Sequence, residues 1–175
     1  MPSLILVNRM TSQQEAPATD EVERVGFAPD EVDTASPTRS ARLKWVVVVD
    51  DSLPPGRAVN AAVCAAAATG VGVEGLLGPD AVDADGSRHR GLPWAGCTVL
   101  AASAERLSVL RERADAAAGL FVADMPHAAQ STRVYDEYRE AVAAVPGSEL
   151  GLAAVSLVGP RNRVDRLVKG LVLLA

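Results

Sequence analysis

The stretch KWVVVVDD, residues 44–51, is the feature that most restricts how this 175-residue chain folds. Four consecutive valines are typical of a strand that is buried on both faces, as at the centre of a sheet with helices on either side. The turn formers Leu-Pro-Pro-Gly follow, and an alanine-rich segment then runs from Gly56 to Thr69. Proline before the first helical turn and glycine after the last one are typical helix boundaries. The stretch therefore predicts a strand, a turn and a helix in an α/β protein.

The same alternation continues to the C-terminus. Apolar runs predict further strands, and segments with apolar residues at helical spacing predict the helices between them. The predicted strands are 44–50, 94–101, 120–123, 150–158 and 171–174, and the helices are 56–69, 104–118, 128–144 and 161–169. A regular β-α-β order predicts a three-layer α/β/α sandwich around a mixed, mostly parallel sheet of four to five strands. Between the first helix and the second strand, VDADGSRHRG is typical of a surface hairpin.

Two regions of different composition divide the chain. Residues 1–26 are polar and without periodicity, which predicts a flexible N-terminal arm, and residues 27–175 form a single α/β domain. Residues 27–43 are expected to lie extended on that domain, with one helical turn after Pro29. The first 40 residues carry seven acids and three arginines, a charge of −4 out of the total of −5. A domain so close to neutral is not expected to bind RNA.

The chain has the composition of a cytoplasmic protein. No window reaches the roughly 18 consecutive apolar residues of a membrane helix, so a membrane is not an expected partner. The N-terminal apolar patch lacks the features of a signal peptide. Both cysteines, Cys64 and Cys97, lie in apolar stretches, which favours reduced thiols.

Candidate binding residues lie in the two segments DDSLPPGRAVN and DMPHAAQ, each of which follows a predicted strand. Strand ends of open α/β sheets place their loops at one edge, so we expect the two segments to line one pocket. Arg57 is expected to bind the negative group of a small anionic ligand, and Asn60 and Gln130 its amide or carbonyl. Asp124 is expected to approach Arg57. The alternative is a structural turn in which Arg57 pairs with a neighbouring aspartate.

Asp124 and His127 are the candidate catalytic residues. One ends a predicted strand and the other begins the next segment, a position where an aspartate and a histidine can form an acid–base pair. Asp124 is equally suited to cap a helix. The sequence has no metal-ligand spacing, and we expect no metal or other cofactor. The cluster Arg161, Arg163, Arg166 and Lys169 is interpreted as a solvated helix face.

Four blocks in the same order resemble an uncharacterised bacterial family, domain of unknown function 2000. They are LKWVVVVDDSLPPGRAVNAA, GLPWAGCTVLAAS, DMPHAAQSTRVYDEY and VSLVGPRNRVDRLVKGLVLL, and the resemblance runs from about Phe27 to the end. That family is similar in fold to type II peptidyl-tRNA hydrolases. Their first strand–helix frame matches Leu53, Gly56, Arg57, Ala61 and Ala62 here.

The matching positions also show departures from the hydrolases. Ala66 stands where those enzymes have a histidine, and Ala128 where their D-A-G-x-T motif has its threonine. An alanine neither transfers a proton nor orients water. We therefore expect a small-ligand-binding or regulatory protein, a homodimer without peptidyl-tRNA hydrolase activity. The alternative is a hydrolase or transferase acting on a peptidyl or aminoacyl ester, possibly of tRNA, so whether the protein is an enzyme stays open at this point.

Overall fold

The apolar run of the sequence forms the centre of the sheet. A computed structural model describes residues 25–175, and in it β1 (Leu43–Asp50) pairs with a strand on each side and is almost wholly buried. The sheet has the order β5-β6-β1-β4-β7. The other strands are β4 (Thr98–Ala102), β5 (Phe121–Pro126), β6 (Leu152–Pro160) and β7 (Val172–Leu173). Pairing on both sides satisfies the backbone polar groups of β1, which is what its burial requires.

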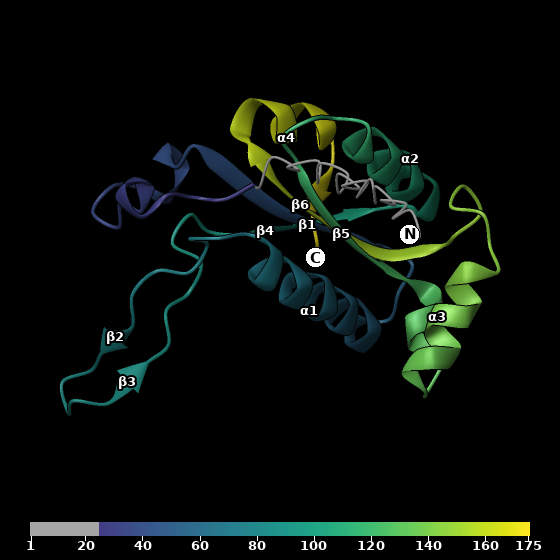
Figure 1. The fold of residues 1–175 in the computed structure, drawn as a ribbon, viewed down its shortest axis with the longest axis horizontal. Helices are drawn as coiled ribbons and strands as arrows, with labels where there is room; N and C mark the ends of the chain where they lie inside the picture. Colours follow the sequence, from purple (N-terminus) through teal and green to yellow (C-terminus); the bar gives the residue numbers. More distant parts are fainter. Residues whose placement is uncertain (1–24) are drawn as a thin grey trace, which may run out of the picture.

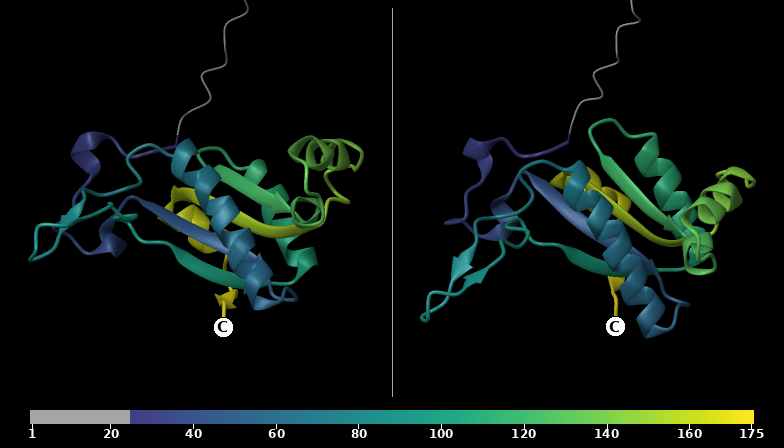
Figure 2. Two further views of the ribbon diagram at one scale, coloured as in Figure 1. Left: turned by 90° about the horizontal axis from the view of Figure 1, so that it is seen from below. Right: turned by 60° about the horizontal axis from the view of Figure 1, so that its bottom comes forward.

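Helices cover both faces of the sheet, which confirms the three-layer α/β/α sandwich (Figure 1). α1 (Pro55–Gly72) lies on one face, whereas α2 (Ala104–Asp115) and α4 (Arg161–Leu167) lie next to each other on the opposite face. Each face has its own core, one around alanines such as Ala61 and the other around leucines such as Leu107. α1 lies along one face of the sheet (Figure 2), and the buried alanines on its inner side allow a close approach.

The strand directions correct the prediction of a mostly parallel sheet. β1 is parallel to β4, but β6 is antiparallel to β1 and β5, and β7 is antiparallel to β4. The prediction assumed that each helix crosses the sheet, which makes the next strand parallel. However, α3 (Tyr135–Ala143) buries no residue and lies beyond the end of β5 (Figure 1). The chain therefore turns back at that end, and β6 enters between β5 and β1 in the opposite direction.

The segment that follows β5 is also different from the prediction of one helix over 128–144. It forms a short 3₁₀ helix, η3 (His127–Gln130), and only then α3. The hydroxyls of Ser131 and Thr132 both donate to the carbonyl oxygen of Ala128, at 3.1 and 3.0 Å. Serine and threonine side chains that bond to nearby carbonyls compete with helix continuation. These two residues therefore end η3 and separate it from α3.

A buried polar network joins α1 to the sheet. The hydroxyl of Thr69 donates to the carbonyl oxygen of Ala65 at 2.8 Å, so its proton is used within α1. Ser156 Oγ lies 2.7 Å from Thr69 Oγ1 and therefore donates to it. Ser156 in turn accepts a 2.9 Å hydrogen bond from the indole N–H of Trp45. Each buried hydroxyl thus has its partner, as burial of polar groups requires.

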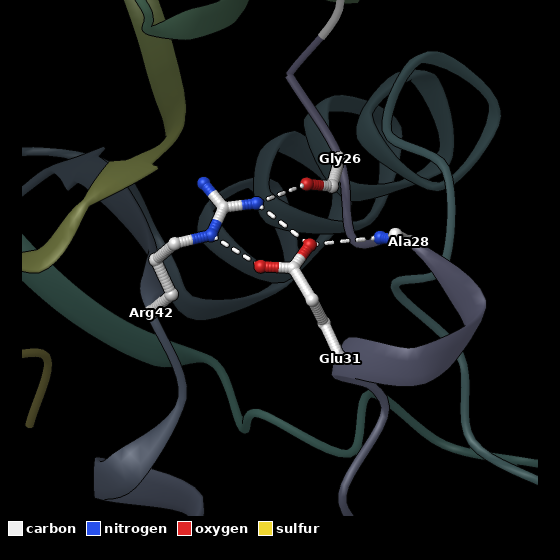
Figure 3. Close-up of polar contacts among 4 residues, drawn as sticks. All are labelled: Gly26, Ala28, Glu31 and Arg42. Atoms are coloured by element: carbon white, nitrogen blue, oxygen red, sulfur yellow. Dashed lines mark hydrogen bonds and ion pairs between the residues drawn. The ribbon is translucent and has the colours of Figure 1, made fainter.

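Residues 27–42 lie on the domain, as predicted for 27–43, but they contain two 3₁₀ turns instead of one, η1 (Pro29–Glu31) and η2 (Thr38–Ser40). Figure 3 shows the central contact: the guanidinium of Arg42 binds both carboxylate oxygens of Glu31, at 2.6 and 2.9 Å. The same guanidinium donates to the carbonyl oxygen of Gly26 at 2.9 Å. Phe27 is buried, and its N–H donates to Glu74. A paired charge and a buried aromatic ring together hold this segment on the domain.

Two smaller expectations can be compared with the structure. The hairpin is present as β2 (Ala81–Val82) and β3 (Arg88–His89), and it projects from the body of the domain (Figure 2). The predicted N-terminal arm falls outside the described residues except for its last two, and of these Gly26 forms a bridge with Glu74.

Among the helices of residues 25–175, none has both the length and the apolar character that crossing a membrane requires.

Candidate functional site

The C-terminal ends of three strands, β1, β4 and β5, lie on the same side of the sheet, which is called its carboxyl edge below. β1 and β4 are parallel, and β5 runs in the same direction because both β1 and β5 are antiparallel to β6. The turn before α1 and the start of η3 therefore meet at this edge (Figure 1). The N–H of His127 donates to the carbonyl oxygen of Gly151 at 3.0 Å, which fixes η3 to the start of β6. Strand ends of this kind are where α/β proteins place their binding sites.

Asp50, the last residue of β1, is the buried carboxylate at this edge. It is 3% exposed. Its Oδ1 accepts hydrogen bonds from the backbone N–H and the hydroxyl of Ser52, at 2.9 and 2.8 Å. Its Oδ2 lies 3.1 Å from Nε2 of His127, whose side chain is 39% exposed. The buried carboxylate thus fixes the orientation of a half-exposed imidazole, an arrangement that suits acid–base chemistry.

Asp50 was missed as a functional candidate in the sequence. The signal was available, because an acid directly after a continuous apolar strand lies at the carboxyl edge of the sheet. The sequence does not indicate its partner, because His127 lies 77 positions later and comes close to Asp50 only in the folded protein. The sequence instead paired His127 with Asp124, three residues away.

The structure gives Asp124 a different partner. Its Oδ2 accepts from Nε of Arg111 on α2 at 3.0 Å, and Arg111 also contacts Asp115 at 3.3 Å. The expected approach of Asp124 to Arg57 is therefore wrong. The reason is that β5 is the outermost strand on its side of the sheet, where a side chain is within reach of α2 as well as of α1. Arg57 is exposed and forms no ion pair with any residue that the structure describes.

The other two predicted binding residues do lie together. Nε2 of Gln130 donates to Oδ1 of Asn60 at 3.1 Å and to the carbonyl oxygen of Arg57 at 2.9 Å. Gln130 therefore joins the two segments, but no residue of 50–60 lines the groove described next, and the expected pocket between the two segments stays a prediction. Oε1 of Gln130 is buried and has no hydrogen-bond partner among the described residues. Whether these amides bind a ligand stays a prediction.

A groove of about 550 Å³ lies between α1, β5 and α3. Alanines of α1 and Met125 give it an apolar floor, and tyrosines of α3 form one wall. Its lining residues are Cys64, Ala67, Ala68, Asp124, Met125, Ala129, Thr132, Arg133, Val134, Tyr135 and Tyr138. Burial, with the charges of Tyr135 and Asp124 nearby, raises the pKa of Tyr138, so this hydroxyl is protonated at neutral pH and offers a donor to the groove.

Outside this groove, the contact of His89 with Asp83 lacks the geometry of a site. His89 lies 3.3 Å from Asp83 within the projecting hairpin, where both side chains are exposed. Within residues 25–175, no group of three or more histidine, cysteine, aspartate or glutamate residues has the arrangement of a metal site.

Comparisons with known proteins place the chain in a family. No match is found among curated proteins. A solved structure, that of Atu0240, a protein of unknown function from Agrobacterium tumefaciens str. C58, is similar with a TM-score of 0.66 and 20% sequence identity. The similarity covers 77% of this chain and 98% of that chain, and it shows a shared fold. The model of the family of proteins of unknown function DUF2000 matches residues 43–175. This match includes every strand of the sheet and all four α-helices, and the chain therefore belongs to the DUF2000 family.

Proposed function

We propose that this protein binds a small organic molecule in the groove between α1, β5 and α3. The observation that carries the proposal is the groove itself, whose volume of about 550 Å³ is within the roughly 300–1,000 Å³ typical of small-molecule sites. Its apolar floor and few polar groups are the usual composition of such sites. Its position next to the carboxyl edge of the sheet is also a usual one.

The charges of the groove indicate the class of ligand. Asp124 is neutralised by Arg111, at 3.0 Å. Arg133 is exposed and has no carboxylate partner among the described residues. The available charge is therefore positive, and the rings of Tyr135 and Tyr138 lie beside it. A small aromatic molecule with an anionic group fits this combination. Arg133 thus takes the role that the sequence suggested for Arg57, which does not line the groove.

The amides of Asn60 and Gln130 belong to the same proposal. Nδ2 of Asn60 is 3.8 Å from Sγ of Cys64, which lines the groove, and Gln130 follows the lining residue Ala129. Neither amide lines the groove itself, so in this proposal they bind a carbonyl or amide of a ligand that extends from the groove towards the start of α1.

An anionic aromatic dye tests the proposal directly. 8-Anilinonaphthalene-1-sulfonate is expected to bind the folded protein with increased fluorescence, and Ala67→Trp, which fills the groove from α1, is expected to abolish the increase. Val71→Trp is the matched control, because Val71 is exposed on α1 and lies outside the groove. Arg133→Gln is expected to weaken binding roughly tenfold, the scale of one charged hydrogen bond. Equal binding by Ala67→Trp and Val71→Trp would contradict the proposal.

A second candidate function is hydrolysis or transfer of a peptidyl or aminoacyl ester, and the contact between Asp50 and His127 favours it. With Nε2 held by Asp50, the other ring nitrogen of His127 is the one that would take a proton from water or an alcohol. In this candidate, Asp50 replaces Asp124 as the acid that orients the base.

A chromogenic ester separates the two functions. If the second candidate holds, the p-nitrophenyl ester of N-acetylalanine is hydrolysed at the same rate by the wild type and by His89→Gln. With His127→Gln, the ester is then hydrolysed no faster than in buffer without protein, and Asp50→Asn hydrolyses it much more slowly than the wild type. His89 is a suitable control because it is the other histidine of the chain and also contacts an aspartate. Undiminished hydrolysis by His127→Gln would exclude the catalytic role.

We further propose that the fold is of the type II peptidyl-tRNA hydrolase kind without that activity. The support is local: Ala66, at the histidine position of those enzymes, is half-buried and packs against the core, so a polar group is not available there.

We also propose a homodimer in the bacterial cytoplasm. Both cysteines are free, as is typical of that compartment, and exposed Val59 and Val63 form an apolar stripe on α1 that a second copy would cover. Light scattering of the full chain tests the dimer.

A further inference from the structure

A second cavity, of about 440 Å³, lies on the opposite face of the sheet between α2 and α4. Its charged lining residues are three arginines, Arg113 from α2 and Arg163 and Arg166 from α4, and no acid lines it. Ala117 and Leu167 contribute apolar surface. The positions i and i+4 of a helix share a face, so Leu167 lies next to Arg163 on α4, whereas Ala117 belongs to the turn that follows α2.

The three guanidinium groups differ in their partners. Arg163 donates through Nη1 to the carbonyl oxygen of Ala118 and thereby joins α4 to the end of the segment after α2. Arg113 and Arg166 are exposed and form no ion pair with a carboxylate among the described residues. Asp165, the acid of α4, forms an ion pair with Lys44 instead, with 2.5 Å between Asp165 Oδ1 and Lys44 Nζ. The cavity therefore has a positive charge that no described side chain neutralises.

We propose that this cavity binds the phosphate group of a small phosphorylated molecule. Like charges that converge on one cavity repel each other, and a bound dianion removes that repulsion. Guanidinium groups match the oxygens of phosphate in planar, two-bond geometry, and several of them surround a tetrahedral anion better than a planar carboxylate. The apolar contribution of Ala117 and Leu167 suits a short organic part attached to the phosphate.

The size and the overall charge favour a small molecule over a nucleic acid. A cavity of about 440 Å³ is in the range of small-molecule sites, roughly 300–1,000 Å³. Binding to an RNA backbone requires an extended basic surface, whereas this chain has 22 acids against 17 bases. This site is on the opposite face of the sheet from the groove of α1 and α3, and it does not depend on the function proposed for that groove.

Calorimetric titration of the full chain in roughly 0.15 M salt, where the Debye length is about 8 Å, tests the proposal, with inorganic pyrophosphate and phenyl phosphate as probes. Both are expected to bind, and phenyl phosphate is expected to shift the amide resonances of Ala117 and Leu167. Arg113→Gln and Arg166→Gln are each expected to weaken binding about tenfold, the effect of losing one charged hydrogen bond. Arg163 is left unchanged, because its bond to Ala118 gives it a structural role.

Arg106→Gln is the matched control. Arg106 is exposed on α2, two turns before Arg113, and lies outside the cavity, so this variant removes the same charge without a lining group. It is expected to leave affinity within about twofold of the wild type, since exposed charges at such distances are screened. Absence of pyrophosphate and phenyl phosphate binding to the wild type would overturn the proposal. So would equal weakening by Arg106→Gln, or a single-stranded RNA that binds tightly and displaces both probes.

Discussion

At the scale of single residues, burial separates the polar groups that maintain the fold from those that are free to bind. Ser156, Thr69 and Asp50 are the buried polar residues of the described chain, and each has hydrogen-bond partners. Arg57, in contrast, is exposed and contributes only its backbone carbonyl to a contact. An unpaired buried group is costly, whereas an exposed side chain has water as an alternative partner.

Ser156→Ala is expected to lower the free energy of unfolding by about 1–3 kcal/mol, the cost of a buried donor left without an acceptor. The donor is the indole N–H of Trp45, which has Ser156 Oγ as its acceptor. Urea denaturation followed by tryptophan fluorescence measures the change. Thr69→Val in the Ser156→Ala background should then cost little more, because the two hydroxyls belong to one network. Fully additive losses would show that the two hydroxyls act independently.

Arg57→Ala is expected to change the free energy of unfolding by no more than about 0.5 kcal/mol, as for most surface substitutions. Gln130→Ala is expected to cost more, about 0.5–1.5 kcal/mol for each hydrogen bond lost, because its amide joins η3 to α1 through Arg57 and Asn60. Thermal denaturation of the two variants side by side gives the comparison. A larger loss for Arg57→Ala would mean that its side chain has a structural partner.

At the scale of elements, one of the charged contacts that attach the segment 25–42 to the domain depends on pH. The hydrogen bonds from Arg42 and then from the N–H of Ala28 lower the pKa of Glu31 from 4.5 to about 2. A carboxyl group whose pKa is lower in the folded state adds stability above its unfolded pKa and loses that contribution as the pH falls through the folded value. The contact therefore weakens between pH 4.5 and about pH 2.

Glu31→Gln is accordingly expected to lower the melting temperature at pH 7, with a difference from the wild type that shrinks as the pH falls from 4.5 towards 2. Melting curves at several pH values, recorded for both proteins in the same buffers, measure this difference. Asp30→Asn is the control, because it removes a neighbouring acid of η1 that does not bind Arg42. A difference that stays constant across the whole acidic range would contradict the assignment.

At the scale of the whole molecule, the three layers place two separate cavities on opposite faces of one sheet. The groove beside α1 and α3 is largely apolar, and the cavity between α2 and α4 is surrounded by arginines. The contact between Asp50 and His127 lies where β1 ends, outside both cavities. The function of the protein therefore depends on the side chains at each of these places, because one fold can serve many different functions.

The purified protein is expected not to cleave peptidyl-tRNA at a rate near that of the type II peptidyl-tRNA hydrolases, whose fold we proposed for it. In that proposal Ala66 and Ala128 stand at the positions of a histidine and a threonine, and neither alanine moves a proton. A deacylation assay with N-acetyl-aminoacyl-tRNA, and a true hydrolase as positive control, measures the rate. Robust turnover that Asp124→Asn abolishes would contradict this expectation and restore Asp124 as a catalytic residue.

The sequence by itself determined the layers and most of the local elements. The exceptions are β4, which begins at Thr98 instead of Trp94, α1, which continues past Gly70 to Gly72, and the segment 128–144. The valine run of β1, the prolines at the start of α1 and the glycine after α2 act through their own backbone preferences, and β1 is found close to its predicted bounds. Arg57, Asn60 and Gln130 were placed together for the same reason, because strand ends lie at sheet edges. Only the tertiary structure decided that β6 is antiparallel, that Asp124 pairs with Arg111 and that His127 pairs with Asp50. Those outcomes depend on where α3 leaves the sheet and on which side chains distant in sequence become neighbours, and no local pattern encodes them.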